Sequence, residues 1–238
     1  MAWQEILAEL AAGRRRLDEQ TGAFSAEAAR HHSRLYCEKG CYNCCTLTVN
    51  CSFAEAWAIS RTLTATQRQI LAEKQPKLQA LSRQAKHLKE FLGLFREQLG
   101  GCAFLNHADG CCSIYQLRPF SCRALLSTRN SSWCAVDFGG LHPLEKEAFL
   151  SSLDPQLVAF PTHYLAASRE LGLELETKAL AAMQHHFGVA MSGNLLYQVW
   201  LEQEHGLSEV IAQGVAATRA LLAARNLNLP YLLHLQEN

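Results

Sequence analysis

The ten cysteines of this chain constrain its fold more than any other feature, because all of them lie between Cys37 and Cys134. Disulfide-rich secreted domains are usually much shorter, and they lack the large cysteine-free region that follows here. The first twenty residues have the pattern of an amphipathic helix rather than a secretory signal, which favours a reducing, cytoplasmic location. In that compartment clustered thiols serve more often as metal ligands or catalysts than as disulfides. Disulfide bonding is the alternative interpretation.

Apart from Cys51, the cysteines fall into two groups. The first has the spacing C-x3-C-x2-C-C and comprises Cys37, Cys41, Cys44 and Cys45. Such close spacing lets several thiolates from one turn converge on a single centre, and soft thiolates favour zinc, Cu(I) or iron–sulfur clusters. The second group is spread over an irregular stretch and comprises Cys102, Cys111, Cys112, Cys122 and Cys134. The sequence therefore predicts a cysteine-ligated metal site.

The combined pattern also identifies a family. C-x3-C-x2-C-C is followed by C-x-F-L and then by G-x-C-x-I-Y-x-x-R-P-x-x-C-R, and this arrangement resembles the YkgJ-type family of bacterial cysteine-cluster proteins. That family is described as a zinc- or iron-chelating domain and is often labelled as containing an iron–sulfur cluster. The resemblance implies metal binding, although it implies no known reaction. Carried over by position, it implies eight metal ligands: Cys37, Cys41, Cys44, Cys45, Cys102, Cys112, Cys122 and Cys134. Cys51 and Cys111 are additional, and the Cys111–Cys112 doublet departs from the single cysteine expected there.

Eight thiolates exceed the four that one tetrahedral zinc ion or one four-iron cluster takes. One 4Fe-4S cluster with four further cysteines, two zinc sites, or two clusters would all account for them. Adjacent side chains point in different directions, which favours separate roles for Cys44 and Cys45. On the strength of the family description we expect an iron–sulfur cluster of the 4Fe-4S type, with zinc as the alternative. The C-x3-C-x2-C spacing also occurs in radical S-adenosylmethionine enzymes, but this chain lacks the alternating strands and helices of their barrel.

Two arginines, Arg118 and Arg123, flank Cys122 and are candidate cofactor-binding residues. An all-thiolate cluster is anionic, so guanidinium groups beside it could stabilise it and form hydrogen bonds with its sulfurs. The alternative is that both arginines form structural ion pairs or cap backbone carbonyls. Among the ten histidines, only His107 and the pair His31–His32 lie near the motif, and we expect surface or structural roles for them.

Outside the cysteine region the chain has helical periodicity, which predicts a mostly α fold with a few very short strands, in which helices surround a loop-rich, cysteine-ligated metal site. Residues 1–36 are expected to form N-terminal helices, and residues 37–134 the metal-binding region with a long inserted helix. Residues 135–238 are expected to form a helical region packed on it as one globular unit. Helix-start signals occur at Ser52–Glu55, Thr64–Gln67, Asp154–Pro155 and Ser208. A long helix is predicted from beyond Pro76 to Gly100. Short strands are predicted over 103–105 and 113–115.

The composition excludes two classes of partner. Lys and Arg together number 22, equal to Asp and Glu, so the chain lacks the basic footprint of a nucleic-acid module. No apolar run approaches the roughly 20 residues that span a membrane. Three functions are left open: a redox or electron-transfer protein with a protein or redox partner, a structural zinc module for protein interaction, and a metalloenzyme that modifies a peptide or small molecule.

Overall fold

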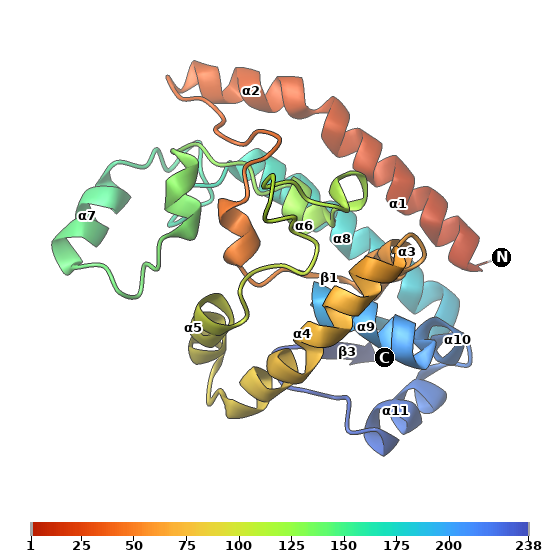
Figure 1. Ribbon diagram of the computed structural model, residues 1–238. Helices are drawn as coiled ribbons and strands as arrows, with labels where there is room; N and C mark the ends of the chain where they lie inside the picture. Colours follow the sequence, from red (N-terminus) through yellow and green to blue (C-terminus); the bar gives the residue numbers. More distant parts are fainter. Residues whose placement is uncertain (1, 238) are drawn as a thin grey trace.

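The computed structural model describes residues 2–237 and is mostly helical with one small sheet (Figure 1). This confirms the predicted fold class. At the N-terminal end, α1 (Ala2–Glu19) is followed directly by α2 (Thr21–Arg30). Ile6 and Leu10 of α1 form part of an apolar stripe and are buried, as the amphipathic pattern of the first twenty residues predicts. They face α8 (Ala166–Phe187), along which α1 packs.

The sheet joins the cysteine-rich region to the C-terminal region. Its middle strand, β2 (Val189–Asn194), pairs antiparallel with β1 (Asn50–Ser52) on one side and with β3 (Leu233–Glu237) on the other. Cys51 lies opposite Gly193 in this register. A Cβ atom at Gly193 would lie 2.2 Å from a carbonyl oxygen at the start of β3. Glycine therefore permits the close approach that closes the sheet.

The core is built around α3 (Phe53–Ser60), every residue of which is buried. Ser52 and Glu55 form the predicted capping box at its first turn, which satisfies backbone N–H groups that would otherwise have no acceptor. α9 (Leu195–His205) packs against both α3 and α4 (Ala65–Gln84). The N-terminal capping box of α4 is also as predicted.

The long helix predicted beyond Pro76 is wrong in two respects. Pro76 lies inside α4 rather than before a helix, and the chain breaks at residues 85–87 before α5 (Leu88–Gln98) begins. The side chain of His87 caps α5. Leu78 and Leu81 of α4 and Phe95 of α5 are buried in one core. The three-to-four-residue spacing therefore continues across the break and does not reveal it.

Between α5 and α8 the chain is irregular and contains only short helices: η2 (Tyr115–Leu117), α6 (Phe120–Arg123), η3 (Ser131–Ala135) and α7 (Pro143–Ser151). α7 lies at one end of the molecule, away from the sheet (Figure 1). The strands predicted over 103–105 and 113–115 do not form; a single bridge joins Leu105 and Cys112 instead.

Two predicted helix starts in the C-terminal region are also wrong. Asp154–Pro155 begins a turn rather than a helix. Ser208 lies inside the short helix α10 (Leu207–Ile211), and the next helix, α11 (Val215–Ala224), begins after Gly214. Among residues 2–237, no helix combines the length and apolar character needed to cross a membrane.

Candidate metal centre

The first cysteine group lies in a tight loop that ends in the short helix η1 (Asn43–Thr46). Gly40 adopts a φ of +89°, the left-handed conformation that glycine tolerates best. The backbone N–H of Cys41 then donates to the carbonyl of Glu38 at 3.1 Å. This winding of the chain places the cysteines of the loop close together in space.

The second group begins in a hairpin-like loop, residues 102–115. The bridge between Leu105 and Cys112 closes this loop and brings Cys102 and Cys112 toward each other. The backbone N–H of Cys102 donates to the carbonyl of Cys45 at 2.9 Å. The second loop is therefore joined directly to the first.

The two loops also meet at a pair of glycines. Gly110 has a φ of +70°, and a Cβ atom on it would lie only 2.8 Å from both the carbonyl oxygen of Gly40 and the ring of Tyr42. A larger residue at this position would push the loops apart.

A third segment, α6, carries Cys122. Its first backbone N–H, from Phe120, donates to Oε1 of the buried Glu55 at 2.7 Å. The hydroxyl of Ser121 donates to the carbonyl of Asn50 at 2.7 Å. α6 is thus attached to α3 and β1, the part of the core next to the cysteine loops.

These three segments surround a shared cavity of about 60 Å³, which six of the eight predicted ligands line: Cys41, Cys44, Cys45, Cys102, Cys112 and Cys122. A second cavity, of about 330 Å³, is lined by Cys37 together with Cys41, Cys44 and Cys122. Cys134 lines neither of these and faces a third cavity. Within residues 2–237, no three Cys, His, Asp or Glu side chains stand in positions that could hold a metal ion as they are. The thiols are gathered around common space, but their sulfurs do not form a coordination shell.

Burial and neighbouring thiols raise the pKa values of six of the predicted ligands: Cys37, Cys44, Cys102, Cys112, Cys122 and Cys134. Burial raises the pKa of Cys37 to about 11 and that of Cys102 to about 12, and neighbouring thiols add to both shifts. The pKa of Cys44 is raised first by its hydrogen bond with Cys45 and then by burial. Cys44 is an electrostatic neighbour of five other predicted ligands, because it contributes to the raised pKa values of Cys37, Cys102, Cys112, Cys122 and Cys134. A bound metal cation would displace these protons, so metal loading should release protons.

Backbone donors point at several of the sulfurs. The N–H of Ser127 donates to Sγ of Cys37 at 3.1 Å. Cys102 and Cys112 each receive a backbone hydrogen bond from the residue two positions later. Such bonds favour the thiolate over the thiol, and in metal–thiolate centres they also tune the redox potential.

The two predicted arginines have different surroundings. Arg118 lines both thiol cavities and lies over the ring of Tyr115, 3.7 Å from its centroid. Its charge lowers the pKa values of Cys44, Cys112 and Cys122. Arg123 also lines the larger cavity, but its guanidinium pairs with Asp18 and donates to the carbonyl of Gln116. Arg118 is therefore the cation placed beside the thiols, while the donors of Arg123 are engaged by protein acceptors.

A histidine that sequence reasoning missed lies next to Cys134. Nε2 of His163 is 3.4 Å from Sγ of Cys134, although the two residues are 29 positions apart and share no motif. Burial, and then the charge of Arg129, lower the pKa of His163 to about 4. Of the histidines considered from the sequence, His107 is exposed and His31 is bound to Asp154.

The two additional cysteines lie outside the thiol cavities. Cys51 is fully buried in β1, where the side-chain amide of Gln198 donates to its carbonyl at 2.9 Å. Cys111 lies next to Asp109 in the exposed part of the second loop, and its backbone N–H donates to the carboxylate there. Of the doublet, only Cys112 lines a thiol cavity.

The donor set fits a soft metal. The smaller cavity is lined by six thiols, and no carboxylate or imidazole is among its lining residues within the described chain. Thiolates prefer zinc, Cu(I) and iron–sulfur clusters to magnesium, calcium or manganese. The residues that would hold such a group are the cysteines already named, with Arg118 beside them.

Comparison with known proteins agrees with this chemistry. Residues 36–138 match the model of the CxxCxxCC family, described as "Putative zinc- or iron-chelating domain". No curated protein and no solved structure matches the chain significantly. The matched segment begins one residue before Cys37 and ends beyond Cys134, so it contains every predicted ligand. Residues 36–138 of this chain are therefore a cysteine-cluster domain of the CxxCxxCC family.

Proposed function

We propose that the thiols around the smaller cavity bind an iron–sulfur cluster of the 4Fe-4S type, and that the protein acts in electron transfer or in a redox-linked reaction. The observation that carries this proposal is the convergence of six thiols from three chain segments on one cavity beside Arg118. A four-iron cluster takes four thiolates. The six thiols around the cavity exceed this number, and the larger cavity next to it adds Cys37.

The electrostatics of the site support a cluster with negative charge. Arg118 supplies a cation at the cavity, and backbone N–H groups point at the sulfurs of Cys37, Cys102 and Cys112. Both features stabilise an anionic thiolate centre, and hydrogen bonds to sulfur raise the reduction potential of such a cluster. We place the protein in the reducing cytoplasm and expect a protein or small-molecule redox partner.

A structural zinc site is the second candidate, and the size of the smaller cavity favours it. At about 60 Å³, this space suits a single ion better than a four-iron cluster unless the loops open. Zinc would link the first loop, the second loop and α6, which are far apart in the sequence. Removal of the metal would then unfold this region, because metal-binding and folding free energies are coupled.

Anaerobic purification followed by iron, zinc and acid-labile sulfide analysis and an absorption spectrum distinguishes the two candidates. The cluster proposal predicts about four iron and four sulfide per cluster, with a broad visible absorption that bleaches on reduction. Stoichiometric zinc with neither iron nor sulfide would overturn it in favour of the zinc site.

The doublet offers a matched pair of variants for the site itself. Cys112→Ser removes a thiol that lines the cavity, whereas Cys111→Ser removes its neighbour outside it. We expect the first variant to lose most of its metal and the second to retain it. Equal metal content in both variants would refute the assignment. A fully loaded double variant, Cys37→Ser with Cys41→Ser, would contradict the role of the first loop.

A further inference from the structure

A third cavity, which Cys134 lines, lies between α5, η3, α7 and the segment 161–164. We propose that it binds a small organic anion with a planar, apolar body, such as an aromatic carboxylate or sulfonate. Its volume is about 380 Å³, which lies in the range of small-molecule sites. This inference concerns a separate ligand and does not depend on which metal the thiols bind.

The walls of this cavity suit a planar apolar group. Trp133, Phe138 and Tyr164 line it together with Leu47 and Val136. Trp133 is held in place by aromatic neighbours, with its ring centroid 6.0 Å from that of Phe138 in a stacked arrangement. Preorganised aromatic surfaces of this kind bind flat apolar ligands with little loss of side-chain entropy.

The charged residues of the cavity are both cations. Arg96 and Lys146 line it, and no Asp or Glu is among its lining residues within the described chain. Nη1 of Arg96 donates to the carbonyl of Val136 at 2.7 Å, and Nζ of Lys146 donates to that of Gly139 at 3.3 Å. Neither cation forms an ion pair with any residue in 2–237. Two half-buried cations without a carboxylate partner are complementary to an anion.

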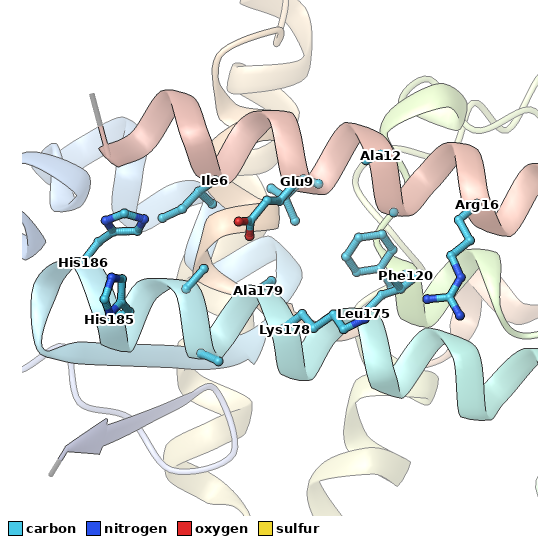
Figure 2. A pocket seen from close by; sticks show the side chains of 14 residues that line it. Ile6, Glu9, Ala12, Arg16, Phe120, Leu175, Lys178, Ala179, His185 and His186 are labelled. Carbon is cyan, nitrogen blue, oxygen red and sulfur yellow. The ribbon is translucent and has the colours of Figure 1, made fainter.

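A larger cavity elsewhere in the described chain does not have this character. It lies between α1 and α8, has a volume of about 580 Å³, and includes Glu9 among its lining residues (Figure 2). Its two cations, Arg16 and Lys178, both contact the same carboxylate, that of Glu174, at 2.8 and 2.6 Å. Their charge is already compensated, so this groove provides a control site rather than a competing proposal.

The position of the third cavity would let a ligand act on the thiol centre. Cys134 and His163 both line it, and η3, which carries Cys134, packs against η1, which carries Cys44 and Cys45. A ligand bound here would therefore touch an element that contacts the first cysteine loop.

The test uses the full-length protein as purified with its metal and two fluorescent probes with the same ring system. Anilinonaphthalene sulfonate carries a negative charge, and phenylnaphthylamine is neutral. We expect both probes to bind. Arg96→Met and Lys146→Met should each weaken sulfonate binding about tenfold, the loss expected for one charge-assisted hydrogen bond, and should change the affinity for the neutral probe less than about twofold.

Two further variants locate the probe. Leu150→Trp places a larger side chain on the wall of the cavity and should abolish binding of both probes, while Lys178→Met in the groove between α1 and α8 should leave both affinities unchanged. The proposal is overturned if Lys178→Met weakens sulfonate binding while Arg96→Met does not, or if the charge variants affect both probes equally. Far-UV circular dichroism confirms folding, and if Leu150→Trp misfolds, the two charge variants still decide the question.

Discussion

Glu55 provides the sharpest test of how α6, and with it Cys122, is held in place. The carboxylate of Glu55 is fully buried. Its Oε2 accepts from the backbone N–H and the hydroxyl of Ser52, at 3.0 and 2.8 Å, and its Oε1 accepts from the N–H of Phe120. Burial raises the pKa of this carboxyl, whereas these hydrogen bonds and the nearby Arg14 oppose the shift. One side chain therefore caps α3 and anchors α6.

Glu55→Ala would leave two buried backbone N–H groups without an acceptor, those of Ser52 and Phe120. Each costs about 1–3 kcal/mol, whereas the backbone N–H of residue 55 keeps its bond to the hydroxyl of Ser52. Removing a buried charge recovers part of the lost free energy of unfolding. We expect a net loss of about 3–5 kcal/mol in the free energy of unfolding, in line with other broken buried charge networks. Glu55→Gln keeps one oxygen acceptor and should lose about half as much.

The other capping box of the chain supplies the control. Thr64 and Gln67 form the same motif at the start of α4, but there it is exposed. Gln67→Ala should cost less than about 1 kcal/mol, because water can replace its hydrogen bonds. Urea unfolding followed by circular dichroism, with metal content held constant, measures all three variants. If Glu55→Ala destabilises the protein no more than Gln67→Ala does, the anchoring role of Glu55 is wrong.

Three further predictions follow from single residues. Gly110→Ala should lower the free energy of unfolding by about 1–3 kcal/mol and speed the loss of metal to a chelator, because its Cβ would strike the carbonyl oxygen of Gly40. Unchanged kinetics of metal release would show that this contact does not hold the two loops together. Burial, and then the charge of Glu55, raise the pKa of Glu176 to about 7, so the folded state retains a proton that the unfolded state releases above about pH 4.5. The stability that this proton contributes is present at low pH and is lost as the pH rises through 7. Between pH 5 and pH 8, Glu176→Gln should remove about 1–3 kcal/mol of this loss in the free energy of unfolding, measured by urea unfolding. If the variant has the same pH dependence as the wild type, the raised pKa of Glu176 is contradicted. Gly193→Ala should lower the free energy of unfolding by more than about 2 kcal/mol, measured in the same way, because its Cβ would overlap the backbone leading into β3; full stability would mean that this strand pair can shift at little cost.

Local signals in the sequence were sufficient to predict much of the helical fold. The capping boxes at Ser52 and Thr64 and the apolar stripe of α1 each depend on residues within one or two turns, and all three are present in the structure. The break before α5 could not be seen, because the same periodicity suits one long helix or two shorter ones that share a core. The turn at Asp154 has the composition of a helix start, but the chain after it does not continue as a helix.

For the site, the sequence by itself determined the chemistry. Thiol spacing over residues 37–134 indicated a soft-metal domain, and the matching family model covers the same segment. Only the tertiary structure decided which thiols share a cavity, that Cys112 rather than Cys111 faces it, and that His163 lies beside Cys134. The sheet that joins β1 to β2 was likewise invisible in the sequence. Spacing along the chain specifies which donors a short loop can present, whereas contacts between distant segments depend on how the whole core packs.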